Sequence, residues 1–329
     1  MSGIRGLTNA IGNLSTRFVD SAVLFAANEA NVFSLLDSPT DAETVAAQLR
    51  WPVRTTRMLL DGLVAIDLLV KSGSQYLNTE LAATCLVPGR PHYQGHIIQH
   101  NANSASLWLR LGDSLRTGNP VRETGEDRSP EELRAFILGM SDIGRLSARE
   151  LLDAVDISTR TNLLDVGGGP GTYALTFLDA VPGMRATIFD RPAVLDIARE
   201  QAEAAGMLNR LSFHPGDLTT DSLGEGYDLV LVSNIIHSYS EQTNRNLISN
   251  CFEALVPGGM LIVKDFLTHN DRSGPAFSLL FALRMQIANG EGDTYSCEQV
   301  ASWTDDAGFD GGRLINLSPQ TRLWIVCKP

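Results

Sequence analysis

Hydrophobic and polar residues in the second half of the chain follow the pattern of short buried strands separated by helices. Six apolar runs predict strands, at residues 163–166, 186–189, 211–213, 229–233, 260–264 and 323–327. The segments between them have helical length and include residues 193–205, 242–255 and 296–307. Because these strands are apolar on both faces, helices must cover both sides of the sheet. The pattern predicts an α/β domain with a doubly wound, Rossmann-like sheet over residues 158–329.

The first hundred residues show a different pattern, in which helical spacing precedes a hairpin. Three segments have helical periodicity, namely residues 15–36, 40–49 and 54–68. Thr40 and Glu43 have the spacing of a capping box at the start of the second helix. Residues 69–77 then predict two short strands around Gly73. Helix, helix and hairpin in this order indicate a mainly helical winged-helix domain over residues 1–100.

The pattern over residues 101–157 predicts a helical connector between the two domains. We expect this connector to contribute to a substrate pocket. The helical pattern is interrupted around Gly118. Ser129, Pro130 and Glu132 then provide the cap residue, first-turn proline and third-position glutamate of a new helix.

Charge distribution limits what the winged-helix domain can bind. Basic and acidic residues cancel between residues 41 and 90, and the whole chain carries a net charge of -12. Nucleic-acid binding needs a basic face and a lipid anchor needs a basic cluster, so neither partner is expected. A protein–protein role for this domain is favoured. The four cysteines are scattered, and no signal peptide or membrane span is evident, so we expect a cytoplasmic protein with free thiols.

A glycine-rich turn follows the first predicted strand of the α/β domain. Its glycines are Gly167, Gly169 and Gly171, so the third comes one residue earlier than in the nicotinamide-binding fingerprint. Asp165 lies two residues before the first glycine, where a carboxylate can accept hydrogen bonds from a ligand's ammonium group. The same carboxylate would repel a pyrophosphate. The turn therefore favours S-adenosylmethionine as the cofactor. The alternative, a nicotinamide dinucleotide, would make the protein an oxidoreductase.

Two further acids follow the next two predicted strands. Asp190 is placed to accept from both hydroxyls of a ribose. Asp217 is placed to accept from an adenine amino group, with Leu218 packing on the ring. Because parallel strands end at one edge of a sheet, Asp165, Asp190 and Asp217 are expected to line one nucleoside site.

His237 lies just beyond the fourth predicted strand, on the side expected to hold the cofactor. A phenol has a pKa of about 10, so a base that removes its proton assists methyl transfer by about 10²–10⁴-fold. Asp265, at the end of the next strand, is the natural acceptor for the second ring nitrogen of His237. His92, His96 and His100 are spaced four residues apart but have no carboxylate or cysteine cluster beside them, so no metal site is expected.

These residues resemble the small-molecule O-methyltransferase family typified by plant caffeic acid O-methyltransferase, which has many bacterial relatives. The resemblance covers nearly the whole chain. Its most specific stretches are residues 139–142, 165–171, 216–217, His237 and 256–259. It implies a homodimer formed through the N-terminal domain. It also implies transfer of a methyl group to a hydroxyl of an aromatic or polyketide-like small molecule, with S-adenosylhomocysteine as the product.

The resemblance also assigns roles to single residues. It implies that Asp190, Asp217 and Leu218 hold the nucleoside, that Tyr239 packs on the adenine, and that Ser233 contacts the cofactor, at a position that is lysine in the plant proteins. His237 matches the base. Four residues match positions that line the acceptor pocket, namely Phe136, Met140, Met285 and Asn289.

The chain departs from the family pattern beside the base. Asp265 is one methylene shorter than the usual glutamate, and Thr294, at the position of the second acid, carries no charge. The family's His-Asp-Trp is here His237-Ser238-Tyr239. A carbon or nitrogen acceptor therefore remains an alternative, as does an inactive homologue that binds a ligand or regulates.

Overall fold

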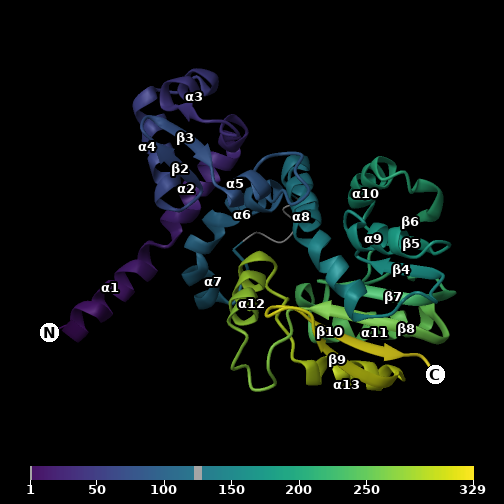
Figure 1. The fold of residues 1–329 in the computed structure, drawn as a ribbon. Coiled ribbons are helices and arrows are strands. Elements are labelled where there is room, and N and C mark those ends of the chain that lie inside the picture. The colour runs from purple at the N-terminus through teal and green to yellow at the C-terminus, as the bar shows by residue number, and fades with distance from the viewer. Residues whose placement is uncertain (1, 122–127) are drawn as a thin grey trace. The chain divides into compact units, whose positions relative to one another are not determined.

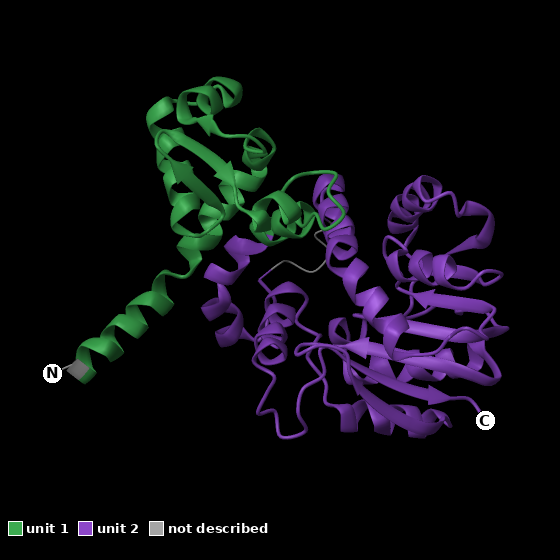
Figure 2. Cartoon of the chain, in the orientation of Figure 1, with its two compact units in different colours: residues 1–103 green, residues 104–329 purple. Residues whose placement is uncertain are grey.

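The computed structural model describes residues 2–121 and 128–329, and the chain divides into two compact units. Unit 1 comprises residues 1–103 and unit 2 comprises residues 104–329 (Figure 2). The division falls within helix α6 (Gly95–Leu109). Residues 122–127, part of the predicted connector, lie outside the described residues.

Unit 1 combines helices with a small sheet (Figure 1). Its helical elements are α1 (Ser2–Thr16), α2 (Phe18–Glu29), η1 (Val32–Leu35), α3 (Ala42–Leu49), α4 (Val53–Ala65) and α5 (Glu80–Cys85). Its strands are β1 (Thr40–Asp41), β2 (Leu69–Ser72) and β3 (Gln75–Asn78), in the order β1-β3-β2. The predicted order of helix, helix and hairpin is confirmed by α3, α4, β2 and β3. Val45, Leu60 and Tyr76 lie in the buried core that joins them.

Two details of the predicted helices in unit 1 are wrong. The single helix expected over residues 15–36 is divided, because α1 ends at Thr16, α2 ends at Glu29, and Asn31 has a left-handed φ of 52° that helical residues do not adopt. The cap of α3 is Asp41, whose carboxylate accepts from Thr44 N at 2.8 Å. Thr40 instead pairs with Tyr76 in the sheet. Thr40 is therefore part of strand β1, and the cap shifts by one residue to Asp41. Strand pairing of this kind cannot be inferred from the local sequence pattern.

Unit 2 is built on a seven-stranded sheet within the described residues, with the order β6-β5-β4-β7-β8-β10-β9. The strands are β4 (Asn162–Val166), β5 (Arg185–Asp190), β6 (Leu211–Pro215), β7 (Tyr227–Ser233), β8 (Leu255–Asp265), β9 (Asp310–Asn316) and β10 (Arg322–Cys327). Strand β10 pairs antiparallel with β8 and with β9, and the other four pairs of neighbouring strands are parallel. The predicted doubly wound sheet is confirmed. Strand β9 was not predicted, because this edge strand is almost wholly exposed and has no apolar run.

Helices of unit 2 alternate with these strands. They are α7 (Leu111–Thr117), α8 (Pro130–Ala154), α9 (Thr172–Ala180), α10 (Pro192–Ala204), α11 (Glu241–Ala254), α12 (Ala276–Ala288) and α13 (Cys297–Ala307), with short 3-10 turns η2 (Leu208–Arg210) and η3 (Ile236–Ser238). The predicted interruption at Gly118 and the capping box of Ser129 and Glu132 are confirmed at the end of α7 and the start of α8. Throughout residues 2–121 and 128–329, no helix combines the length and apolar character needed to cross a membrane.

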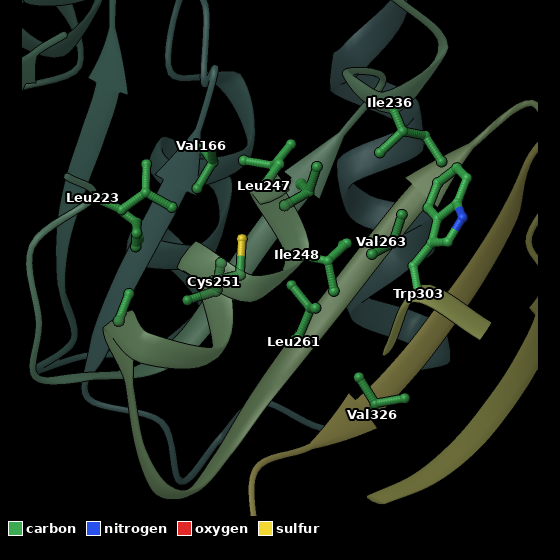
Figure 3. Close-up of a cluster of buried hydrophobic side chains, with 14 of the residues drawn as sticks. Val166, Leu223, Ile236, Leu247, Ile248, Cys251, Leu261, Val263, Trp303 and Val326 are labelled. Atoms are coloured by element: carbon green, nitrogen blue, oxygen red, sulfur yellow. The ribbon is translucent and has the colours of Figure 1, made fainter. Parts of the chain in front are cut away.

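Two apolar cores cover the opposite faces of this sheet. Residues of α11 and α13, including Cys251 and Trp303, pack on the face formed by Val166 and Val263 (Figure 3). Helices α8, α9 and α10 pack on the other face. Successive side chains of each strand enter opposite cores, so the apolar strands are buried on both sides. Polar side chains are therefore concentrated where the strands end.

Arg210 fixes the connection between α9 and β5. Its guanidinium donates to the carbonyls of Leu178, Val181 and Met184 at 2.7–3.0 Å. Arg210→Met leaves these acceptors without a donor, so we expect a loss of about 2–3 kcal/mol in the free energy of unfolding, measured by urea denaturation. Arg185→Met, at an exposed position at the start of β5, is the control and should change it by less than about 0.5 kcal/mol. Equal effects of the two substitutions would contradict this role.

Candidate functional site at the carboxyl edge of the sheet

The loop after β4 depends on glycine for two physical reasons. Gly167, Gly169 and Gly171 all have φ between 57° and 76°, which side chains disfavour. A Cβ at Gly167 would also lie 2.3 Å from Ile235 Cδ1, whereas a Cβ at Gly169 would meet nothing within 4 Å. The loop is thus packed against the protein at its first glycine and faces open space at its second. This open side leaves room for a ligand beside the loop.

Asp165 is buried at the end of β4, directly before this loop. Its Oδ2 has no hydrogen-bond partner among the described residues. The pKa of Asp165 is raised to about 7, because burial raises it most, the backbone hydrogen bond from Ala174 lowers it, and the charge of Asp190 raises it. A carboxylate in this state lacks a cationic partner, so the site fits the ammonium group of S-adenosylmethionine.

The ends of the next two strands supply two more acids. Asp190 accepts from Gly169 N at 2.9 Å and from Arg191 N at 2.7 Å, so it joins β5 to the glycine loop. Burial raises its pKa. Asp217 accepts through Oδ1 from the backbone N–H and the hydroxyl of Thr219, and these hydrogen bonds lower its pKa.

Leu218 and Tyr239, the other two residues predicted to hold the nucleoside, also lie at this edge. Leu218 is buried and lies 4.0 Å from the Cβ position of Gly167. The pKa of Tyr239 is raised by burial and then by the charge of Asp217, while Arg191 lowers it. Arg191 was not among the predicted residues. Arg191 directly follows Asp190 at the end of a predicted strand, and this position could have marked it as a residue of the same edge.

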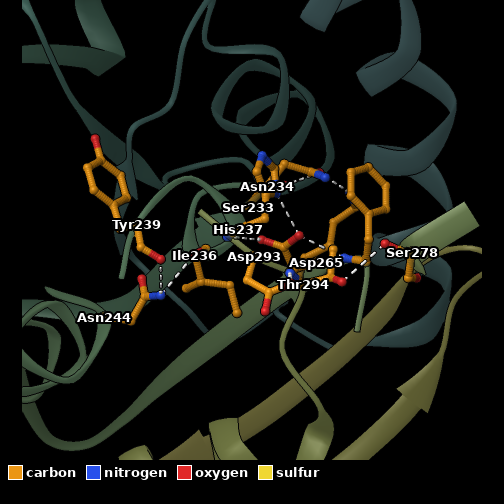
Figure 4. A network of polar contacts seen from close by, with 12 residues as sticks. Ser233, Asn234, Ile236, His237, Tyr239, Asn244, Asp265, Ser278, Asp293 and Thr294 are labelled. Atoms are coloured by element: carbon orange, nitrogen blue, oxygen red, sulfur yellow. Dashed lines mark hydrogen bonds and ion pairs between the residues drawn. The ribbon is translucent and has the colours of Figure 1, made fainter. Parts of the chain in front are cut away.

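His237 lies in η3 and is held by the end of β8 (Figure 4). Its Nδ1 lies 2.8 Å from Asp265 Oδ1, and both side chains are buried. Asp265 also accepts from Phe266 N at 2.7 Å. An aspartate here favours the tautomer with the proton on Nδ1, which leaves Nε2 as an acceptor. Within the described residues Nε2 has no hydrogen-bond partner.

Thr294 is buried but is directed to another partner. Its hydroxyl donates to the carbonyl of Ser278 at 3.1 Å (Figure 4). Among residues 2–121 and 128–329 it makes no hydrogen bond with His237. The imidazole is therefore oriented by one carboxylate, that of Asp265.

Aromatic side chains surround the imidazole. Phe266 stacks with His237 at a ring-centroid distance of 5.7 Å, and Phe281 meets it edge-on at 4.8 Å. Phe277 contacts both phenylalanines. These rings were missed by the sequence analysis. The signal was present, because residues 277, 281 and 285 recur every four positions and so share one face of α12.

The four predicted acceptor residues belong to two segments, helix α8 and helix α12 with the residue that follows it. Met285 is buried on α12, and Asn289 follows that helix and donates to Ser238 O at 2.8 Å. Met140 is partly buried on α8. Phe136 packs with a cluster that includes residues of α10, so its described packing is not against the His237 loop.

Neutral donors hold the backbone around His237. Asn244 Nδ2 donates to Ile236 O at 2.8 Å and to Tyr239 O at 3.2 Å (Figure 4). Tyr295 also donates to Tyr239 O, at 2.6 Å. Neither side chain was predicted, because both lie in helical or loop segments without a distinctive local motif.

In the part of the chain that the structure describes, no three or more His, Cys, Asp or Glu side chains are grouped as metal ligands are. The fold and this edge, with a glycine loop, a buried carboxylate whose Oδ2 has no partner among the described residues and a carboxylate-bound histidine, define an S-adenosylmethionine-dependent methyltransferase. Comparison with known families agrees: the O-methyltransferase domain matches residues 116–310 and the O-methyltransferase dimerisation domain matches residues 13–88. The chain belongs to this O-methyltransferase family. The predicted family, fold class and cofactor are confirmed.

Individual relatives match over nearly the full length. The 3-hydroxy-5-methyl-1-naphthoate 3-O-methyltransferase of Streptomyces sahachiroi is 32% identical over 93% of this chain and 90% of its own. The N,N-dimethyltransferase OxyT of Streptomyces rimosus is 29% identical over 90% of this chain and 89% of its own. The structure of human N-acetylserotonin methyltransferase in complex with S-adenosylmethionine has a TM-score of 0.90 and 27% identity, and the match covers 98% of this chain and 97% of that one.

The raised pKa of Asp165 predicts a pH-dependent stability in the absence of ligand. Between the ordinary value of 3.8 and about 7, the folded chain keeps a proton that the unfolded chain releases, so rising pH lowers the free energy of unfolding. Asp165→Asn does not show this pH dependence, because the amide side chain does not titrate. The free energy of unfolding of the variant minus that of the wild-type protein should therefore rise by on the order of a few kcal/mol from pH 4 to 7, then level off. Parallel urea titrations measure it, and a pH-independent difference would exclude the proposed burial effect.

Proposed function

We propose that this methyltransferase transfers the methyl group of S-adenosylmethionine to a hydroxyl of an aromatic or polyketide-like small molecule, with His237 as the general base. The observation that carries the proposal is the buried contact between His237 and Asp265 at the edge that carries the glycine loop. The names of relatives support the acceptor class, because the Streptomyces sahachiroi enzyme is named for O-methylation of a hydroxynaphthoate.

His237 prepares the acceptor for in-line attack. Asp265 accepts a hydrogen bond from Nδ1–H and fixes the ring, so Nε2 is available to take the proton of the acceptor hydroxyl. The bound cofactor supplies the electrophilic methyl group on its sulfonium. Phe266 and Phe281 limit the motion of the ring and exclude water from it. Alignment of the acceptor with the methyl group contributes much of the rate in such a displacement.

The cofactor-binding residues follow the order of the strands. In this proposal Asp165 binds the ammonium group, and Gly167 and Gly169 allow close approach of the backbone. Asp190 binds the ribose hydroxyls and Asp217 the adenine amino group. Three residues complete the cofactor site by packing or polar contact, namely Leu218, Ser233 and Tyr239.

The acceptor site is proposed beside η3 and α12. Met285 and the phenylalanines of α12 present apolar and aromatic surface, which suits a planar acceptor. Asn289 shapes this wall indirectly, because its amide is bonded to the backbone of the His237 loop. Phe136 and Met140, both on α8, are proposed as the opposite lining.

Nitrogen methylation is the second candidate. It is favoured by the similarity to OxyT, named as an N,N-dimethyltransferase, and by the uncharged Thr294 at the position of a second acid. Incubation of candidate phenols and amines with a labelled methyl donor distinguishes the two, when the labelled atom is located by mass spectrometry and nuclear magnetic resonance.

We further propose a homodimer formed through unit 1, which contains the matched dimerisation domain. Helix α1 presents an exposed apolar stripe of Ile4, Leu7, Ile11 and Leu14, each 59–71% exposed, and Phe18 continues it. Their spacing of three and four residues is that of a helix that packs against another helix. A second copy of this chain would bury the stripe.

Replacement of the base tests the catalytic proposal. His237→Ala should lower kcat by about 10²–10⁴-fold, because no other group removes the acceptor proton, while S-adenosylhomocysteine affinity measured by calorimetry stays within about two-fold. Asp265→Asn should lower kcat less than His237→Ala does. His269→Ala, an exposed histidine bonded to Ser273, is the matched control and should retain activity. Full activity of His237→Ala would exclude His237 as the base.

Charge placed on the α1 stripe tests the dimer. Leu7→Glu combined with Leu14→Glu should convert the dimer to a monomer, because two carboxylates would be buried without partners. Light scattering reports the mass directly. Leu208→Glu, an exposed leucine in unit 2, serves as the control and should leave the mass unchanged. A doubly substituted protein that remains dimeric would show that α1 is not required.

A further inference from the structure

Lys264 is a buried lysine that the proposed reaction does not use. It is 3% exposed and lies one residue before the end of β8, in register with Ser233 of β7. Side chains alternate along a strand, and Leu163 and Ile262 belong to the same core. Two residues further along their strands, Asp165 and Lys264 therefore lie on that same face of the sheet.

The ammonium of Lys264 is only partly satisfied by the protein. Its Nζ donates to Asn234 Oδ1 and lies 5.6 Å from the centroid of the Tyr173 ring. Among the described residues no carboxylate lies within ion-pair distance of it. Tyr173 is the second residue of α9, directly after the glycine loop, so this ammonium lies beside the helix that the loop leads into. Burying a charge without an opposite charge is costly, which favours an anionic ligand.

Asp165 and Lys264 are side chains of opposite charge type on the two strands that flank β7. Strands β4 and β8 are separated by β7 alone, and neighbouring strands lie about 4.8 Å apart. Asp165 is level with Leu231 of β7 and Ile262 of β8, so Lys264 lies two residues further toward the carboxyl edge, and the two backbone positions are roughly 12 Å apart. The lysine side chain spans much of this distance. Asp165 Oδ2 offers an acceptor without a partner and Lys264 offers an ammonium. Together they are complementary in charge to a ligand that carries an ammonium and a carboxylate on one carbon.

We propose that Lys264 binds the carboxylate of the cofactor's methionine moiety, while Asp165 binds the ammonium on the same carbon. The inference rests on the cofactor site proposed above. It makes Lys264 a further determinant of cofactor recognition, supplied by β8 where its partner on β7 is the uncharged Ser233.

A structural role for Lys264 is the rival explanation. Asn234 adopts a left-handed φ of 58°, and its Oδ1 accepts from Lys264 and from Ser233 Oγ. Lysine could therefore serve only to hold this turn before His237. Such a role would affect every ligand of the edge alike, whereas a carboxylate contact affects only ligands that carry a carboxylate.

Decarboxylated S-adenosylmethionine separates the two explanations. This compound keeps the adenosine, the sulfonium and the ammonium, but lacks the carboxylate. Calorimetry with the full-length protein gives the affinity for S-adenosylmethionine and for the decarboxylated compound, and their ratio is determined within one preparation. We expect the wild-type protein to favour S-adenosylmethionine by about 10- to 100-fold, the value of one charge-assisted contact.

Substitutions then assign the contact. Lys264→Met should bring the ratio close to one by weakening S-adenosylmethionine alone, and Lys264→Arg should restore part of it. Asp165→Asn should weaken both compounds, since both carry the ammonium. Lys71→Met, which removes an exposed lysine paired with Asp61, should leave both affinities unchanged.

Four outcomes overturn the inference. A wild-type protein that binds both compounds equally has no carboxylate contact. A Lys264→Met protein that keeps both wild-type affinities shows that another group makes the contact. A Lys264→Met protein that binds both compounds equally more weakly, and so keeps their ratio, supports the structural role instead. If the wild-type protein binds neither compound, the proposed cofactor site fails and this inference fails with it. The ratio within the wild-type protein remains measurable even if a variant does not fold.

Discussion

Burial of the central sheet on both faces is the constraint on which the rest of unit 2 depends. Strands packed between two layers of helices can carry polar side chains only where they leave the core. Asp165, Asp190, Ser233 and Asp265 all lie at such ends. Parallel strands end at the same edge, so one packing requirement gathers polar residues of four strands at the edge that carries the glycine loop.

The same burial determines the charge state of that edge. Asp165 has a raised pKa because it lies in the core, and Lys264 lies equally deep on the same face. Neither is paired with the other or with a second charge among the described residues. A site in which an acidic and a basic side chain lie apart, each incompletely hydrogen-bonded, is preorganised for a ligand that carries both an ammonium and a carboxylate.

Around His237, orientation comes from one carboxylate and a set of neutral groups. Asp265 bonds the ring, while Asn244, Tyr295 and Asn289 bond the backbone carbonyls of the loop. A loop held in this way has little freedom to move the imidazole away from Asp265. This explains how the chain can position the histidine although Thr294 is bonded elsewhere.

The sequence by itself determined the doubly wound sheet, the glycine loop and the residues at the strand ends, because apolar runs and glycine spacing are local signals. It did not determine the division of the helix over residues 15–36, the cap at Asp41 or strand β9, because strand pairing and exposure decide these. Only the folded structure places the ring of Phe281 edge-on to His237 and the ammonium of Lys264 near Tyr173. Those contacts join segments distant in sequence, and no local pattern records them.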